Sequence, residues 1–193
     1  MKKILIGIGI TISLIIGMFI ISYMTNPLVA NGKINLAGFG QIQMSSLLRN
    51  ADKMGFMAAY AYSVSDKNQR IEDYSIYLYE KASYFGDVES DVFLGLYFNF
   101  IKNDTSKGLQ YFNKVMKKSE NVGNLCFAIH YILKEKNYEK GIDLLKKLQA
   151  KNFRSVMKIN LEDPINYESI KKEMENLKNV YLEKKDMGVE FGW

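Results

Sequence analysis

The stretch FLGLYFNFIKNDTSKGLQYFNKVM, residues Phe93–Met116, decides the fold because its pattern returns 33 residues later, in Phe127–Gln149. Lys107–Leu109 (KGL) falls on Lys140–Ile142 (KGI), and small and large apolar side chains recur at matching places in both copies. A period near this length is typical of stacked helical hairpins. We therefore expect an all-α fold, an α-solenoid of antiparallel helical hairpins.

Segments on either side of this pair extend the expected solenoid to about three to four hairpins over residues 41–163. A first helix is expected at Gln41–Lys53, with a helix stop at Met54–Gly55. Further along, Asn103–Thr105 provides turn and N-cap chemistry between two helices. The expected hairpins pair 56–64 with 70–85, 88–102 with 106–119, and 123–135 with 138–150.

The last helix is expected to cap the stack at its C-terminal end. After a degenerate unit that starts at Phe153, Asp163 and Pro164 suit an N-cap and a first helical residue, so we assign residues 164–185 to this helix and 186–193 to a tail. Apolar residues recur along it at helical spacing, and its other face is charged. A helix that is apolar toward the stack and polar toward water is typical of a terminal cap. The apolar positions are Ile170, Met174, Leu177 and Tyr181.

Residues 1–24 predict a membrane or export segment. Lys2 and Lys3 precede Ile4–Met24, a run without a charge that would form a helix of about 31 Å, close to the roughly 30 Å of a bilayer core. Two interpretations are open: an uncleaved anchor, or a secretory signal cleaved after Leu28–Ala30. The lysine pair places the N-terminus in the cytoplasm. We expect a bacterial single-pass inner-membrane protein with its domain in the periplasm, or a secreted or periplasmic one if the segment is removed, with residues 25–40 as a linker.

The composition describes a folded chain with a solvated surface. Of its 193 residues, 48% are hydrophobic and 24% charged, which indicates a globular class. The net charge of +5 is spread among interspersed lysines and carboxylates, whereas a nucleic-acid-binding protein usually has a dense basic stripe, so we expect no nucleic acid. Cys126, the only cysteine, has apolar neighbours and is expected to be a buried packing thiol.

The repeat resembles the Sel1-like branch of the tetratricopeptide repeat superfamily. Leu94–Phe98 (LGLYF) is close to the Leu-Gly-x-x-Tyr pattern of the first helix in Sel1-like repeats. Tyr79–Gly86 (YEKASYFG) is close to the second-helix pattern, and Asn50–Gly55 is a looser copy of it. The resemblance covers about residues 41–153. It implies a helical-hairpin solenoid.

A search for catalytic chemistry finds no set of residues that would form an active site. The single histidine, His130, lies among apolar neighbours and is expected to be a partly buried structural imidazole. One His and one Cys do not make a usual zinc site, and the chain contains no Gly-x-Ser-x-Gly, Walker A loop or dinucleotide fingerprint. We therefore expect no enzyme, no cofactor and no metal.

Aromatic and basic residues are the candidates for protein binding. Exposed tyrosines are favoured anchors at protein interfaces, and a group of lysines on the later second helices could form a patch for an acidic partner or simply a solvated face. The candidate tyrosines are Tyr60, Tyr77, Tyr84, Tyr97 and Tyr111, and the candidate lysines are Lys114, Lys117 and Lys118, with Lys146 and Lys147 beside them.

Three functions remain open from the sequence. The first is a membrane-tethered, exported adaptor that binds another protein through its helical-hairpin groove. The second is a narrower form that the Sel1-like resemblance implies, an immunity protein that neutralises a toxic secreted effector such as a lipase in the bacterial periplasm. The third is an envelope hydrolase or sugar-binding module that uses groove carboxylates. The partner and the oligomeric state are not defined by the sequence.

Overall fold

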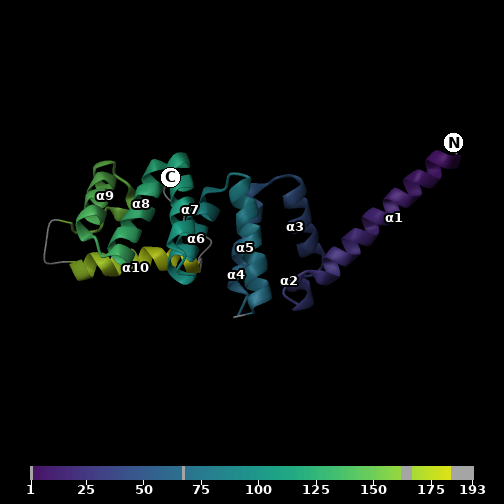
Figure 1. Ribbon diagram of the computed structural model, residues 1–193, viewed down its shortest axis with the longest axis horizontal. Coiled ribbons are helices and arrows are strands. Elements are labelled where there is room, and N and C mark those ends of the chain that lie inside the picture. The colour runs from purple at the N-terminus through teal and green to yellow at the C-terminus, as the bar shows by residue number, and fades with distance from the viewer. Residues whose placement is uncertain (1, 67, 162–166, 184–193) are drawn as a thin grey trace.

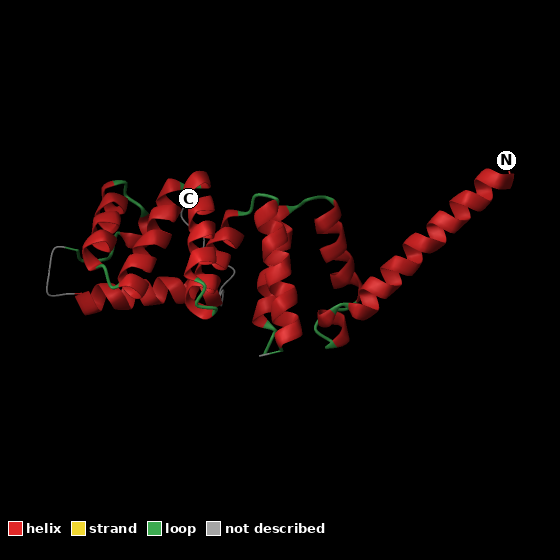
Figure 2. Cartoon of the chain, in the orientation of Figure 1, coloured by secondary structure: helices red, strands yellow, loops and turns green. Residues whose placement is uncertain are grey.

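The computed structural model describes the backbone of residues 2–66, 68–161 and 167–183, with side chains from Thr11 onward. Within these ranges every regular element is helical and no strand occurs, which confirms the expected all-α class (Figures 1 and 2). The elements are α1 (Lys2–Thr25), α2 (Pro27–Ala30), α3 (Leu36–Leu47), α4 (Ala51–Ser63), α5 (Gln69–Tyr84), α6 (Val88–Leu96), the π-helical η1 (Tyr97–Ile101), α7 (Thr105–Lys118), α8 (Glu120–His130), the π-helical η2 (Tyr131–Glu135), α9 (Tyr138–Ala150), the 3₁₀ turn η3 (Arg154–Val156) and α10 (Tyr167–Glu183).

Helices that follow one another in the chain pack together. The main contacts join α4 to α5, α6 to α7 and α8 to α9, and further contacts of α5 with α6 and of α7 with α8 join these pairs. The helix α10 crosses this row and contacts α6, α8 and η2, and its Tyr167 ring lies 4.9 Å from the ring of Tyr138 in α9 (Figure 1). It therefore packs on the first helices of two successive pairs.

From α2 to α9, every helix except α8 begins where asparagine or aspartate caps it. Asn50 Oδ1 accepts a hydrogen bond from Lys53 N at 2.9 Å, and Asp104 Oδ1 accepts one from Lys107 N at 3.0 Å. Such a side chain satisfies an N–H group that has no partner inside the helix. The expected cap in Asn103–Thr105 is therefore confirmed at Asp104. The residue before the cap often adopts a left-handed backbone, as at Arg49, Gly86, Asn103 and Lys136.

Gly108 explains part of the sequence repeat. A Cβ atom there would lie 2.7 Å from Asn99 Cβ and 2.9 Å from the carbonyl oxygen of Gly95. Gly141 is its counterpart in the second copy, where an added Cβ would lie 2.4 Å from Cγ1 of the Ile132 side chain and 3.4 Å from the carbonyl oxygen of Ala128. The recurring glycines let the two helices of a pair approach closely, which larger side chains would prevent.

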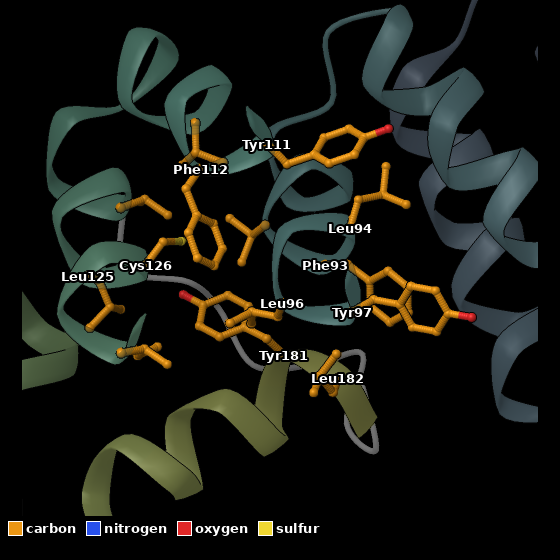
Figure 3. Packing of buried hydrophobic residues seen from close by; sticks show 14 of the residues in the cluster. Phe93, Leu94, Leu96, Tyr97, Tyr111, Phe112, Leu125, Cys126, Tyr181 and Leu182 are labelled. Atoms are coloured by element: carbon orange, nitrogen blue, oxygen red, sulfur yellow. The ribbon is translucent and has the colours of Figure 1, made fainter. Parts of the chain in front are cut away.

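The core is continuous along the row of helices and rich in aromatic rings. Phe93 stacks on Tyr79 with ring centroids 3.9 Å apart. Tyr181 and Leu182 of α10 lie beneath the end of α6 and complete this core (Figure 3). Cys126 is buried within it, as expected for a packing thiol, and burial raises the pKa of its thiol. Packing of this cluster holds the helices in register.

Two expected boundaries differ in the structure. The first expected helix is two helices, α3 and α4, with the break at Leu48–Asn50 instead of Met54–Gly55. The break falls there because Arg49 has φ of 52° and Asn50 caps α4, whereas Gly55 is helical and allows close approach of Asp87. The expected linker 25–40 contains α2 and the start of α3. The expected cap at Asp163 and Pro164 and the tail 186–193 lie outside the described residues.

The helix α1 extends away from the row of helices (Figure 1). Its large aliphatic side chains are exposed from Ile12 to Met24. Phe19, which is also exposed, and the half-buried Tyr23 contact Phe39 of α3 at ring-centroid distances of 5.3 Å. In the part of the chain for which the structure gives a description, no helix is long and apolar enough to cross a membrane.

Candidate functional site

A groove lies between α5 and η1, and we call it the α5–η1 groove. Its volume is about 210 Å³. One wall is a single face of α5, because residues spaced three and four apart lie on one side of a helix. The π-helical turn η1 forms the floor and the other wall. The lining residues are Asp73, Ile76, Tyr77 and Glu80 from α5 and Tyr97, Phe98 and Lys102 from η1 and its C-cap.

Two lining residues of the groove, Tyr97 and Lys102, both contact Glu72. The Tyr97 hydroxyl donates a hydrogen bond to Glu72 Oε1, and Lys102 Nζ lies 3.0 Å from the same oxygen. Burial and the bond to Glu72 raise the pKa of Tyr97 to about 12. Burial also raises the pKa of Glu72, but the hydrogen bonds from Tyr97 and Lys102 outweigh it and hold this pKa below its usual 4.5. Hydrogen bonding with Tyr97 and Glu72 raises the pKa of Lys102.

A second ion pair borders the other side of the groove. Lys107 Nζ lies 3.1 Å from Glu80 Oε1 and 3.8 Å from the centre of the Phe98 ring. Phe98 in turn stacks on Tyr111, with centroids 5.9 Å apart. Burial, followed by the nearby charges of Glu80 and then Asp91, raises the pKa of Tyr111 to about 12. The groove is therefore an aromatic surface held between two fixed charge pairs.

Two tyrosines project from α5 next to this groove. Tyr77 is 50% exposed and Tyr84 is 82% exposed, and their spacing of seven residues places them on one face of the helix. Lys81, between them on the same face, lies 5.6 Å from the centre of the Tyr77 ring. Exposed aromatic side chains next to a preformed groove are the kind of surface on which protein partners anchor.

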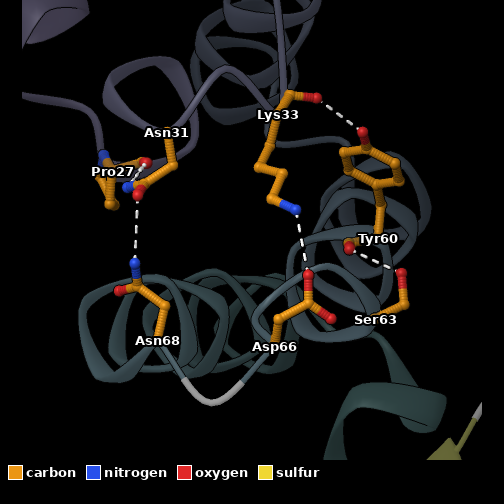
Figure 4. Close-up of polar contacts among 7 residues, drawn as sticks. All are labelled: Pro27, Asn31, Lys33, Tyr60, Ser63, Asp66 and Asn68. Carbon is orange, nitrogen blue, oxygen red and sulfur yellow. Dashed lines mark hydrogen bonds and ion pairs between the residues drawn. The ribbon is translucent and has the colours of Figure 1, made fainter.

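The other candidate tyrosines have internal contacts. The Tyr60 hydroxyl donates to the carbonyl oxygen of Lys33 at 2.6 Å and so ties α4 to the segment before α3 (Figure 4). Tyr97 is 1% exposed and forms the groove floor, and Tyr111 is 8% exposed. Of the five tyrosines, the structure brings Tyr77 and Tyr97 into the groove, places Tyr111 behind Phe98, and leaves Tyr84 on the surface.

The candidate lysines do not form one free patch. Lys118 Nζ lies 2.6 Å from Asp91 Oδ2, and Asp91 is fully buried and also accepts a hydrogen bond from Ser83. Lys114 lies over the Tyr111 ring at 4.5 Å. Lys117 is exposed, as are Lys146 and Lys147 on α9.

A buried polar cluster joins η1 and η2. Asn99 and His130 are nearly fully buried, with Asn99 Nδ2 2.9 Å from His130 Nδ1, and His130 Nε2 lies 2.9 Å from Glu135 Oε1. Both contacts are satisfied when the Asn99 amide donates to Nδ1 and Nε2–H donates to the carboxylate. Lys134 Nζ donates to the carbonyl oxygen of Asn99 at 3.1 Å. His130 therefore links the two copies of the repeat, and it is more deeply buried than the partly buried imidazole that the sequence predicts.

Nothing in the described part of the chain places three or more His, Cys, Asp or Glu side chains where they could hold a metal ion. In the lining of the α5–η1 groove, Glu80 and Lys102 form ion pairs with Lys107 and Glu72, and Asp73 accepts a hydrogen bond from Gln69. Such an arrangement offers a shaped surface with fixed charges, which suits recognition of a side chain or a peptide segment.

Sequence reasoning missed Glu72, Phe98 and Lys102. A helical projection of α5 would have placed Asp73, Tyr77 and Glu80 on one face. The π-helical turn that brings Phe98 and Lys102 opposite this face has no comparable signal in the sequence.

No family model, no curated protein and no solved structure matches this chain.

Proposed function

We propose that the protein is a non-enzymatic, membrane-tethered, exported repeat protein that binds another protein through its helical-hairpin surface. In this proposal the three helix pairs are the hairpins of a short solenoid of the Sel1-like or tetratricopeptide-like kind. The recurrence of sequence and backbone supports this part. The hydrogen bond from Asp104 N to Phe98 O, at 2.7 Å, has its counterpart from Asn137 N to Tyr131 O at 2.8 Å.

The observation that carries the binding function is the exposed aromatic face of α5 beside the α5–η1 groove. Tyr77 and Tyr84 offer large contact areas with few rotatable bonds, which are common anchors at interfaces. The two ion pairs hold Tyr97 and Phe98 in place before a partner arrives, so little side-chain freedom is lost on binding. The partner is therefore a protein that inserts an apolar or aromatic side chain beside Tyr77.

The membrane tether is supported by α1. The uncharged run Ile4–Met24 follows Lys2 and Lys3, and the described side chains of α1 are exposed although they are apolar. These exposed apolar side chains of α1 are unfavourable in water and favourable in a bilayer. With the lysines on the cytoplasmic side, the helical domain is on the exported side.

The test is capture of a partner by the purified full-length chain from solubilised envelopes of the source cell. We expect one dominant protein, and we expect the double variant Tyr77→Ala/Tyr84→Ala to bind it at least about tenfold more weakly, because two anchors are removed. Tyr167→Ala is the matched control, since Tyr167 is 43% exposed and lies on α10. Equal binding by the double variant and the wild type would remove the α5 face from the proposal, and the absence of any partner would contradict the function.

A further inference from the structure

The helix α3 exposes an apolar face that no other described element covers. Residues 34–48, between Lys33 and Arg49, carry no charge. Leu47 is 75% exposed and Leu48 is 69% exposed, and Leu36 and Met44 are also exposed. Isolated exposed apolar residues are common on proteins, but a contiguous group of them marks a surface that contacts something other than water.

This face continues onto α4 through a hollow. A cavity of about 580 Å³ lies between the two helices, with Met44 and Leu48 of the α3 side and Phe56 and Met57 of α4 in its lining. Phe56 is 52% exposed at its edge. We call Leu36, Met44, Leu47, Leu48 and Phe56 the α3–α4 apolar face. The face and the hollow adjoin at the N-terminal end of the row of helices, and the hollow also has polar groups in its lining, from Gln41, Ser45, Asn50 and Lys53.

The α3–α4 apolar face lies next to the segment proposed as the membrane anchor. Phe39, fully buried on α3, packs against Phe19 and Tyr23 of α1 with ring centroids 5.3 Å from each. The exposed apolar side chains of α1 and those of α3 therefore lie on neighbouring helices that touch. Between Ile4 and Leu48 the only charged residue is Lys33, and its Nζ is paired with Asp66 at 3.1 Å.

The length of α3 decides which part of a bilayer it can enter. Its 12 residues make a helix of about 18 Å, too short for a hydrocarbon core of roughly 30 Å. A short helix with an apolar face suits the boundary between headgroups and acyl chains instead. Arg49 and Lys53 are exposed at the end of this face, where long basic side chains reach lipid headgroups, and Asp52 is the one acid between them.

We propose that the α3–α4 apolar face rests in the headgroup–acyl boundary of the same bilayer that α1 crosses. The inference depends on the proposed membrane tether. It adds a second membrane contact besides α1, which holds the helical domain against the bilayer. This contact fixes the orientation of the row of helices relative to the bilayer. It therefore also fixes the orientation of the α5–η1 groove.

The experiment measures depth in the bilayer with the full chain in vesicles of phosphatidylcholine and phosphatidylglycerol. A fluorophore sensitive to polarity is attached at Leu47→Cys on α3, at Ile16→Cys on α1, or at Lys146→Cys on α9 as an exposed control. The native Cys126 is 1% exposed and does not compete for the label under native conditions. Nitroxide lipids that carry the quencher at a shallow or a deep position report the depth of each label.

We expect the Leu47 label to shift to shorter wavelength on addition of vesicles and to be quenched at least about twofold more by the shallow than by the deep nitroxide, as for an interfacial helix. The Ile16 label should be quenched more by the deep nitroxide, and the Lys146 label by neither. If Ile16 is quenched and Leu47 behaves as Lys146 does, the tether stands and the inference is overturned. If none of the labels is quenched, the tether itself fails. If the Leu47 label shifts without lipid as protein concentration rises, a second copy covers the face, and the inference is again overturned.

Discussion

Gly108 shows how one residue can fix the distance between two helices. Its missing side chain lets α7 approach α6 until the Gly95 carbonyl oxygen would lie 2.9 Å from any added Cβ. We expect Gly108→Ala to lower the free energy of unfolding by about 1–3 kcal/mol, because backbone atoms cannot yield as a flexible side chain can. Urea denaturation followed by circular dichroism measures the change.

Gly40→Ala is the matched control for this variant. Gly40 is also helical, in α3, and an added Cβ there would meet nothing within 4 Å. We expect this substitution to raise the free energy of unfolding by about 0.5–1 kcal/mol, because alanine favours the helix more than glycine does. A loss of stability in Gly40→Ala equal to that in Gly108→Ala would show that close helix approach is not the cause.

The ionisation of Glu72 makes the stability of the folded chain depend on pH. Its pKa in the folded chain lies below 4.5, so the unfolded chain takes up the proton first as pH falls. The stabilisation is present at neutral pH and is lost as pH falls through the folded-state pKa. We expect Glu72→Gln to unfold about 1 kcal/mol more easily than the wild type at neutral pH, with the difference shrinking in acid.

The measurement is urea denaturation of both proteins from neutral pH to well below 4.5. Asp73→Asn is the control, since Asp73 is an exposed neighbour on α5 whose carboxylate accepts a bond from Gln69 instead of an ion pair. A difference between Glu72→Gln and wild type that stays constant with pH would contradict the role given to the Glu72 carboxylate.

At the scale of single helices, the N-cap depends on contacts between residues that are close in the sequence. Asp104 caps α7 through the 3.0 Å bond from Lys107 N. We expect Asp104→Ala to lower the free energy of unfolding by about 1 kcal/mol, and Asp104→Asn to keep most of the stability, because asparagine also accepts this bond. Thermal and urea unfolding measure both. Asp143→Ala, an exposed position inside α9, should change stability by less than about 0.5 kcal/mol.

For the molecule as a whole, α10 is the element that joins helices distant in sequence. Met174 is fully buried where α10 crosses α6 and α8. We expect Met174→Asp in the full chain to lower the free energy of unfolding by more than about 3 kcal/mol, because a charge would be buried without a partner.

Lys172→Asp, on the exposed face of the same helix, is the control for the charge and should be close to neutral. If Met174→Asp unfolded at the same urea concentration as Lys172→Asp, α10 would not be an integral part of the fold.

Much of the fold could be read from the sequence because its signals are local. The cap at Asp104 and the burial of Cys126 follow from a residue and its near neighbours, and the all-α class follows from apolar positions that recur after 33 residues. The first break was misplaced at Met54–Gly55, since glycine usually stops a helix. At Gly55 it instead makes room for Asp87 of the next helix pair, which is a tertiary reason.

By itself, the sequence determined that the chain is helical and where α5, α6, α7 and α9 begin to within one residue, because apolar periodicity and capping depend on residues a few positions apart. It also determined that a unit recurs after 33 residues. Only the tertiary structure decided that Tyr77 and Tyr84 are exposed while Tyr97 and Tyr111 are buried. It also decided that α10 crosses the row of helices, and that Glu72, Tyr97 and Lys102 meet. These features depend on which faces of separate helices come together, and packing of the whole core settles that.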